Sequence, residues 1–500
     1  MEVDIISRQC IKPSSPTPNH LTTFNISLLD QFAPHLYVPH LLFYPPSKAS
    51  ISETSKLFKQ SLSKTLALYY PLAGKAKNSL SIDCNDEGAS YITARVNRHL
   101  SDCLKQPTLS TVSNFLPSGI TFTEVKPGAH VVVIQETLFS CGCVAIALVF
   151  PHSIMDAISL SGFMKTWATI ARQQSSIGAN LSPNFSASSI FPQTSTAFPE
   201  DLTALNLSSV YRRNGKFFVN RFVFGGSTIT KLKAEAMSSA VQNPTRVEVV
   251  FAMLLKCIMS ALRVKSGKQK PALAINAVNL RRKAVPPYPE TAVGNFIWIE
   301  PIFSRVGDLE LCDFVQRIRE SVSSINGDFV KSLEGDGGFN ILCESLKEID
   351  KSCSKALSEG AEPIGLNSWC NMGFYEADFG WGKPLWIPFF LGLSEPPNAF
   401  FIYLMDTRHG NGIEAWVVLD EEIMPMLQLD MELRSLVSLD PSPLEIGLLS
   451  CINREVYSII CDNLQPATYG RIDVGVFYYL CEDRTGLDLL ALLLVFYGTI

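Results

Sequence analysis

The residues most suited to catalysis in this chain of 500 amino acids lie in a His152-x-x-x-Asp156 motif. An imidazole titrates near neutral pH, so it can accept the proton of a hydroxyl group while that group attacks a substrate. The motif alone is weak evidence, because a histidine at a strand end that bonds only to backbone gives the same pattern. Its interpretation depends on what else the sequence contains.

A second motif, Asp378-Phe379-Gly380-Trp381-Gly382, lies far downstream and includes one of only 6 tryptophans in the chain. Such a string rarely arises by chance. Its two glycines permit tight backbone turns, and its two aromatic rings can pack beneath them. We interpret this motif as structural and assign it no proton-transfer step.

The hydrophobic pattern predicts the elements that position His152. Runs of β-branched and apolar residues over 130–138 and 144–150 predict two strands joined by a turn. The second run leads directly into His152, after which apolar side chains recur at helical spacing: Leu160, Phe163, Met164, Trp167, Ile170 and Ala171. We therefore expect His152 at a strand-to-helix junction, where a rigid sheet presents reactive side chains.

Two regular regions flank a segment rich in residues that break helices and strands. Before that segment, residues 52–68 predict a helix. After it, we expect strands near 217–224 and 272–278, helices near 228–240 and 246–264, and a hairpin within 397–419. The predicted organisation is an N-terminal domain over 1–171, a crossover linker over 172–216, a C-terminal domain over 217–443 and an atypical extension over 444–500.

Composition restricts the partners. The net charge of -5 and the pI near 5.9 provide no basic field for nucleic acid. The 13 cysteines are scattered without Cys-x-x-Cys pairs, so no metal site is expected. The first residues lack the basic and apolar regions of a signal peptide, which favours the cytoplasm. The apolar stretch 487–496 is shorter than the roughly 20 residues of a spanning helix, so no membrane association is expected.

The two motifs together resemble the plant BAHD family of coenzyme A-dependent acyltransferases, over roughly residues 5–443. Further segments are similar to the same family: Tyr69-Tyr-Pro-Leu-Ala-Gly74, Asn279-Leu-Arg281, Asn367-Ser-Trp369 and Leu404-Met-Asp-Thr-Arg408. The opening Pro13 to Pro18 segment, Leu29-Asp-Gln31 and Ile82 to Asp86 more narrowly resemble its vinorine synthase-like branch.

The resemblance implies an α/β fold of two chloramphenicol acetyltransferase-like domains, each a mixed β-sheet with helices, joined by a long crossover. It also implies a monomer with its site in a channel between the domains and no permanently bound cofactor. The expected reaction moves an acyl group, with acetyl favoured, from acyl-CoA to a hydroxyl group. An amine is the less favoured acceptor. The acceptor molecule is expected to be a plant specialised metabolite such as an alkaloid, terpenoid or phenolic alcohol.

The resemblance also implies roles for single residues. His152 is the expected general base, because an alcohol is scarcely ionised at neutral pH. Asp156 is expected to point away and pair with Arg281 in support of the histidine loop, although a catalytic dyad is the alternative. Trp369 matches a family tryptophan near the reaction centre and is a candidate oxyanion donor, with a core aromatic as the alternative. Asp378 to Gly382 are expected to hold the architecture and the coenzyme channel.

Three lysines, Lys265, Lys268 and Lys270, form a basic cluster that is a candidate for contacts with the phosphates of coenzyme A. A solvated loop explains the same cluster.

Two other functions fit the same resemblance. A catalytically inactive protein of this fold would bind a metabolite or acyl-CoA without turnover, and a hydrolase would deliver the acyl group to water. The extension over 444–500 has no counterpart in the family pattern, so we expect its deletion to leave folding and activity intact.

Overall fold

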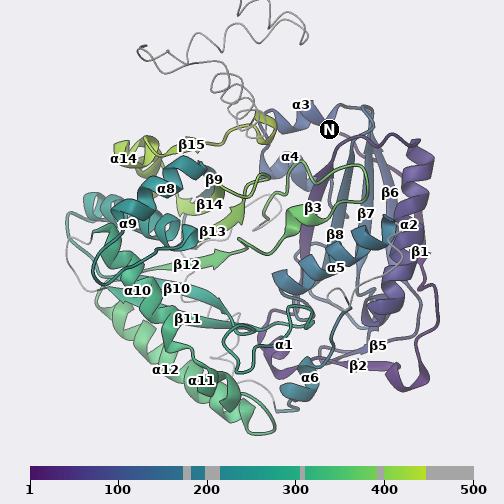
Figure 1. Ribbon diagram of the computed structural model, residues 1–500, viewed down its shortest axis with the longest axis horizontal. Coiled ribbons are helices and arrows are strands. Elements are labelled where there is room, and N and C mark those ends of the chain that lie inside the picture. Colours follow the sequence, from purple (N-terminus) through teal and green to yellow (C-terminus); the bar gives the residue numbers. More distant parts are fainter. Residues whose placement is uncertain (173–181, 197–213, 305–309, 391–398, 446–500) are drawn as a thin grey trace, which may run out of the picture. The chain divides into compact units, whose positions relative to one another are not determined.

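Two mixed β-sheets form the framework of the computed structural model, which describes residues 1–172, 182–196, 214–304, 310–390 and 399–445 (Figure 1). The first sheet has the strand order β1-β6-β7-β8-β3. Its strands are β1 (Asp4–Ile11), β6 (Ala89–Val96), β7 (Val133–Phe139), β8 (Val144–Pro151) and β3 (Tyr37–Tyr44). Only the β6–β7 pair is parallel, and the other three neighbouring pairs are antiparallel.

The second sheet has the order β11-β10-β12-β13-β14-β9-β15. Its strands are β11 (Ile297–Ser304), β10 (Ala272–Asn279), β12 (Glu362–Ser368), β13 (Phe400–Asp406), β14 (Ile413–Asp420), β9 (Phe217–Phe224) and β15 (Val437–Leu439). The β10–β12 and β12–β13 pairs are parallel, so this sheet is mixed as well. A small third sheet joins β2 (Thr23–Asn25), β5 (Ser81–Asp83) and β4 (Lys75–Ala76).

Helices cover both larger sheets. The longer ones are α2 (Ile51–Leu68), α5 (Ala157–Ala171), α8 (Gly226–Glu235), α9 (Arg246–Ser266), α10 (Leu311–Ser324) and α12 (Gly338–Ser358). Shorter ones are α1 (Leu28–Phe32), α3 (Leu100–Leu104), α4 (Leu109–Ser113), α6 (Ala187–Ile190), α11 (Gly327–Ser332), α13 (Ile423–Leu429) and α14 (Met431–Arg434). The expected α/β fold with a mixed sheet in each half is confirmed.

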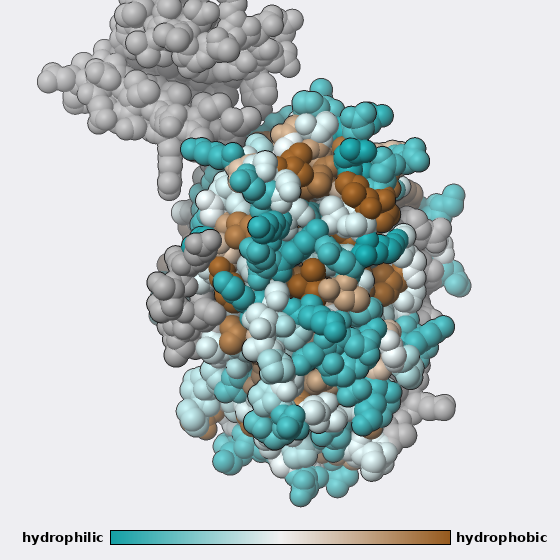
Figure 2. All heavy atoms as spheres, turned by 90° about the vertical axis from the view of Figure 1, so that its right-hand side faces the viewer, coloured by the Kyte–Doolittle hydropathy of each residue, from teal (hydrophilic) through white to brown (hydrophobic). Residues whose placement is uncertain are grey.

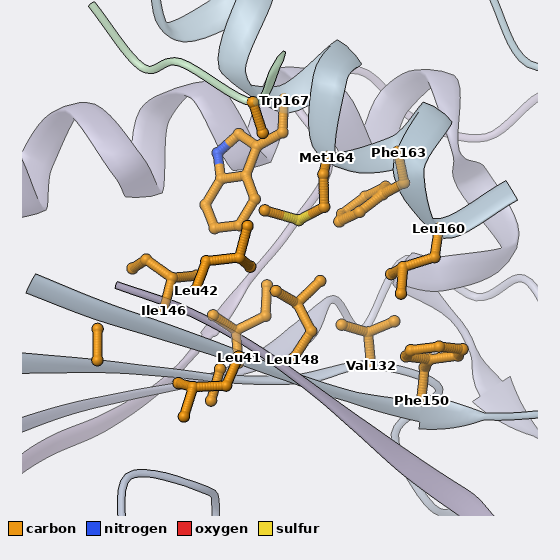
Figure 3. Packing of buried hydrophobic residues seen from close by; sticks show 14 of the residues in the cluster. Leu41, Leu42, Val132, Ile146, Leu148, Phe150, Leu160, Phe163, Met164 and Trp167 are labelled. Carbon is orange, nitrogen blue, oxygen red and sulfur yellow. The ribbon is translucent and has the colours of Figure 1, made fainter. Parts of the chain in front are cut away.

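The helix after His152 is fixed by an apolar face. In Figure 3, Leu160, Phe163, Met164 and Trp167 of α5 point toward the strands that carry Leu41, Ile146 and Leu148. All of these side chains are buried, and burying each large one stabilises the fold by about 1.5–3 kcal/mol. The end of β8 and the start of α5 are therefore held as one rigid unit, and His152 lies between them.

The first strand, β1, forms an edge of the first sheet and is exposed along most of its length. Figure 2 shows the side of the molecule toward which β1 and α2 lie in Figure 1, and hydrophobic groups there are interspersed among hydrophilic ones. Asp4 and Arg8 place charges on this strand, which is a common protection of sheet edges against further pairing.

Most predicted elements are confirmed within a few residues, including the β7–β8 pair, α5, β9, α8, α9, β10 and the β13–β14 hairpin. The exact domain boundaries stay predictions. Parts of the proposed crossover, 173–181 and 197–213, and the extension from 446 onward lie outside the described residues.

Candidate active site

His152 lies in the turn between β8 and α5, and both of its backbone polar groups are bound. Its N–H donates to the carbonyl of Leu36 at 2.9 Å. Its carbonyl accepts a hydrogen bond from Asn295 Nδ2 at 2.8 Å. The ring nitrogen Nδ1 is buried and has no hydrogen-bond partner. The position of the imidazole therefore depends on its backbone rather than on a carboxylate behind the ring.

Asp156 binds an arginine. Arg281 Nη1 donates to Asp156 Oδ2 at 2.6 Å, and Arg281 Nη2 donates to Oδ1 at 3.1 Å. Both side chains are almost completely buried. Asp156 also caps α5, because its Oδ1 accepts the backbone N–H and the hydroxyl of Ser159. The carboxylate thus links the start of α5 to the loop that carries Arg281.

A cavity of about 360 Å³, called the small cavity below, contains His152 in its lining. Its other walls are largely apolar and include six phenylalanine and tyrosine side chains: Phe122, Phe150, Phe389, Phe390, Phe401 and Tyr403. Trp369, at the end of β12, also lines it, half-buried and stacked on Phe374 with the ring centroids 5.1 Å apart. Apolar walls of this kind suit a hydrophobic ligand that is oriented by a few polar groups.

A second cavity of about 810 Å³, called the large cavity below, adjoins the first. Six residues line both cavities: Ile158, Ala277, Val278, Asn279, Ser368 and Met372. The large cavity also contains four cationic side chains, Lys165, Arg282, Lys283 and Arg319. The two spaces thus share residues at the start of α5 and at the ends of β10 and β12. They differ in character, since the small cavity is rich in aromatic side chains and the large cavity carries cationic ones.

The cations of the large cavity differ in their partners. Arg319 binds Glu248 and Arg282 binds Glu290, each at 2.8–2.9 Å. Lys283 instead donates to the carbonyl of Val322. Burial lowers the pKa of the Lys283 ammonium. An anion bound in this cavity would therefore be attracted to Lys283 and would oppose that shift.

The motif from Asp378 to Gly382 lines neither cavity. Asp378 Oδ1 accepts the N–H groups of Gly380 and Gly382, both of which have positive φ. Phe379 packs against Phe58, Tyr44 and Trp167 from three elements of the first half, and Trp381 stacks on Phe379.

The three lysines of the basic cluster also line neither cavity. Lys265 forms ion pairs with Asp420 and Glu422, and Lys270 pairs with Glu362 at 2.5 Å. Lys268 is exposed.

His40 is a candidate site residue that the sequence did not reveal. It lies on β3, lines the small cavity and contacts the rings of Trp369 and Phe374. Burial lowers the pKa of His40 to about 3, so its imidazole is neutral at physiological pH. Its Nε2 is buried without a hydrogen-bond partner. No spacing rule links His40 to His152, because the two residues come together only through the β3–β8 pairing.

Among the residues that the structure describes, no group of three or more histidine, cysteine or acidic side chains is arranged to hold a metal ion. No helix among those residues combines the length and apolar character needed to cross a bilayer.

Comparison with known proteins identifies relatives of this chain. Residues 1–434 match the model of the Transferase family. An epi-neemfruitin B 7-O-acetyltransferase of Melia azedarach is 42% identical over 459 residues, which covers 89% of this chain and all of that protein. A limonoid 7-O-acetyltransferase of Citrus sinensis is also 42% identical, with the same coverage. A stemmadenine O-acetyltransferase of Catharanthus roseus is 33% identical, covering 86% of this chain and 97% of that protein.

Solved structures agree with the architecture. The crystal structure of vinorine synthase superposes with a TM-score of 0.71 at 31% identity, over 87% of this chain and 99% of that one. TRI101 of F. sporotrichioides, complexed with coenzyme A and T-2, superposes with a TM-score of 0.66 at 17% identity, over 84% of this chain and 99% of that one. The second likeness concerns the fold alone.

Proposed function

Because this chain belongs to the Transferase family, the BAHD acyl-CoA-dependent O-acyltransferases, we propose that it acetylates a hydroxyl group of a polycyclic plant terpenoid from acetyl-CoA. The observation that carries this proposal is that His152 lines an apolar, aromatic-rich cavity that adjoins a cavity with cationic side chains. A base in such a cavity can contact the acceptor while the thioester approaches from the adjoining one.

His152 acts as the general base in this proposal. Its imidazole accepts the proton of the acceptor hydroxyl as the oxygen attacks the thioester carbonyl, a contribution of about 10²- to 10⁴-fold in rate. The tetrahedral intermediate then collapses, the C–S bond breaks and the thiolate of coenzyme A takes the proton from the imidazolium. The products are the ester and free coenzyme A, so no covalent enzyme intermediate is needed.

The negative oxygen of the tetrahedral intermediate needs a hydrogen-bond donor. We assign that role to the indole N–H of Trp369, which is a donor only and whose side chain lines the same cavity as His152. Asp156 and Arg281 support the loop of His152, and their mutual ion pair is the observation in favour of that role.

The small cavity is proposed for the acceptor. Its walls of phenylalanine, tyrosine and tryptophan suit a polycyclic hydrocarbon frame better than a highly charged molecule. The relatives at 42% identity are named for epi-neemfruitin B and for a limonoid, whereas the alkaloid acetyltransferase is 33% identical. A limonoid-like alcohol is therefore the first acceptor to test, ahead of alkaloid or phenolic alcohols and of amines.

The large cavity is proposed for acetyl-CoA. Lys283 and Arg282 at its wall are suited to phosphate groups, which prefer charged donors. The basic cluster of Lys265, Lys268 and Lys270 remains a separate candidate for the same phosphates. Alanine variants of Lys283 and of Lys268 distinguish the two, since only the variant of the true contact raises KM for acetyl-CoA.

The protein is further proposed to act as a monomer in the cytoplasm. This proposal rests on the family resemblance and, for the compartment, on the scattered cysteines, which suit a reducing environment. Light scattering after gel filtration measures the oligomeric state directly.

The function is tested with the purified full-length protein, acetyl-CoA and a panel of limonoid, alkaloid and phenolic alcohols. Mass spectrometry should reveal a product heavier by one acetyl group, and free coenzyme A should appear in equal amount. Binding of acetyl-CoA without any product would support an inactive binding protein. Release of coenzyme A at the same rate without an acceptor would support a hydrolase.

A further inference from the structure

Asp30 is a buried carboxylate that lines neither the small nor the large cavity. It lies in the first turn of α1 and is almost completely buried. Its Oδ2 accepts the N–H and the hydroxyl of Ser27, at 2.9 and 2.7 Å, which completes a capping box. The matching acid of α2, Glu53, is exposed, so capping alone does not require such burial.

The second oxygen of Asp30 binds a residue 265 positions away. Asn295 donates to Asp30 Oδ1 twice, through its backbone N–H at 2.6 Å and through Nδ2 at 2.8 Å. The same Nδ2 donates to the carbonyl of His152 at 2.8 Å. Both acceptors require the NH₂ group, so the orientation of the Asn295 amide is fixed.

This orientation leaves Asn295 Oδ1 buried without a hydrogen-bond partner. An unpaired buried acceptor is unfavourable. Rotating the amide by 180° would not remove this cost, because its NH₂ group could then no longer bridge the His152 carbonyl oxygen and Asp30 Oδ1. The arrangement therefore keeps the contact between Asn295 and the backbone of His152 and leaves the amide oxygen of Asn295 without a hydrogen bond.

The neighbouring residues are held by the other buried carboxylate. Phe296 N–H donates to Asp156 Oδ2 at 3.1 Å, and Arg281 donates to the carbonyl of Gly294 at 3.2 Å. The segment 294–296 thus binds Asp156 on one side and Asp30 on the other. Only the contact through Asn295 reaches His152 itself.

We propose that Asp30 is a positioning residue for His152: its carboxylate fixes the amide of Asn295, which in turn fixes the backbone of the histidine. This inference rests on the proposed role of His152 as the base. Its physical reason is that the imidazole has no partner at Nδ1, so the backbone contacts with Leu36 and Asn295 determine where the ring lies.

The surroundings of Asp30 contain no cation among the described residues. Ser27, Gly294 and Asn295 contact or approach its oxygens. His35 lines a neighbouring cavity together with Asp30, but its Nδ1 lies 2.8 Å from Ser153 Oγ and burial lowers its pKa. Burial raises the pKa of Asp30 to about 6. The carboxylate is therefore ionised at neutral pH and has the acceptor capacity that the bridge needs.

Ionised Asp30 lowers the stability of the fold. Its pKa is raised above the unfolded value, so the unfolded state releases the proton first as pH rises from 3.8 to about 6. The contribution of Asp30 to stability is complete below that window and is lost above it. A buried carboxylate that lowers stability at neutral pH is consistent with a functional role for its contact with Asn295.

The test compares Asp30→Asn and Asn295→Ser with Ser27→Ala. Asn295→Ser retains the backbone N–H to Asp30 and loses the bond to the His152 carbonyl. Ser27→Ala removes the hydroxyl contacts of the capping box, retains the backbone N–H that binds the same carboxylate, and leaves the bridge intact. We expect kcat to fall about 10- to 100-fold in the first two variants, with KM for acetyl-CoA unchanged. Ser27→Ala should retain kcat and melt at a lower temperature.

A second measurement is independent of turnover. The imidazole resonances of His152, assigned by their loss in His152→Gln, should shift or broaden in Asp30→Asn and Asn295→Ser but not in Ser27→Ala. Unchanged His152 resonances in both variants would overturn the positioning role, even if activity fell. Inactivity of the wild type toward every acceptor would contradict the proposed function but not the positioning role. The His152 resonances would still show whether Asp30 and Asn295 fix the position of the histidine.

Discussion

The imidazole of His152 is the single group whose removal should reduce activity most. His152→Ala should lower kcat about 10²- to 10⁴-fold, because the acceptor hydroxyl loses its base. The fold should be unaffected, since the Nδ1 of His152 has no hydrogen-bond partner to lose. Steady-state assays and circular dichroism measure the two effects.

A matched control is His99→Ala. His99 is exposed and its side chain makes no capping hydrogen bond to α3, so its loss should change neither activity nor folding. Full activity in His152→Ala would remove this residue from the mechanism.

Asp156→Asn tests support against catalysis. The substitution leaves Arg281 buried with an uncompensated charge, so the free energy of unfolding should fall by about 3–5 kcal/mol. The exposed ion pair of Arg282 with Glu290 is the control. Glu290→Gln should lower the free energy of unfolding by less than about 1 kcal/mol. Urea unfolding measures both. A stable Asp156→Asn with strongly reduced kcat would instead indicate a catalytic dyad.

The sequence predicted those candidate site residues that lie within recognisable motifs. His152, Asp156, Arg281 and Trp369 each belong to a short motif, and the structure brings Asp156 and Arg281 together as an ion pair. The sequence did not indicate His40, Asp30 or Asn295 as candidate site residues. Their contacts join distant segments, and a hydrogen bond between residues 265 positions apart leaves no local spacing to detect.

At the level of elements, the segment that begins with Ala377 fixes the second half of the chain to the first. Tyr44 donates its hydroxyl to the carbonyl of Ala377, and Phe43 of β3 pairs with Trp386. Phe58 of α2 packs against Phe379. The motif therefore joins β3 and α2 to the chain that leads into the second sheet.

Asp378→Ala should weaken this junction. Two backbone N–H groups, those of Gly380 and Gly382, lose their acceptor, so the free energy of unfolding should fall by about 1–3 kcal/mol. The kcat of the folded fraction should stay near that of the wild type. Glu376→Ala, in an exposed neighbour, should change stability by less than about 0.5 kcal/mol. Loss of kcat without loss of stability would give the motif a direct role.

Elements with clear periodicity were predictable, and β3 shows why others were not. Its run Tyr37–Tyr44 contains Pro39, and a proline argues against a central strand. The structure places β3 at the edge of its sheet, where a missing N–H is tolerated. The position of a strand within a sheet depends on pairing between distant segments, so the sequence alone did not reveal it.

At the scale of the whole molecule, stability should depend on buried carboxylates. Glu136 is buried, accepts hydrogen bonds from Ser55 and Tyr91, and has its pKa raised by burial. Its stabilising contribution is complete below the ordinary glutamate pKa of about 4.3 and is lost as pH rises through the raised native value. The stability of the wild type relative to Glu136→Gln should therefore fall as pH rises.

The opposite trend is expected for Glu53→Gln. The contacts of Glu53 with Ser50 lower its pKa, so its contribution is present above the ordinary value and is lost as pH falls. Urea unfolding at several pH values measures both differences. If the stability of the wild type relative to Glu136→Gln rose with pH, burial would not be the dominant influence on the pKa of Glu136.

The end of the chain offers another test at this scale. The described residues up to Glu445 belong to one compact unit, and Leu444 packs against the core of the first sheet. Ser442 donates its hydroxyl to the carbonyl of Leu104. Truncation after Leu448 should therefore retain the melting temperature and kcat, whereas truncation after Pro441 should lower the melting temperature. If the chain truncated after Leu448 were insoluble, residues 449–500 would be required for folding.

The residues that line only one of the two adjoining cavities also bear on how such an enzyme diversifies. On the proposed assignment, Phe122, Phe389 and Phe390 contact the acceptor space and lie outside the coenzyme space. Substitutions there can change the range of alcohols without weakening the use of acetyl-CoA. A gene copy released from selection for its old substrate can thus acquire a new one in few steps, and directed evolution should begin with libraries at these three positions.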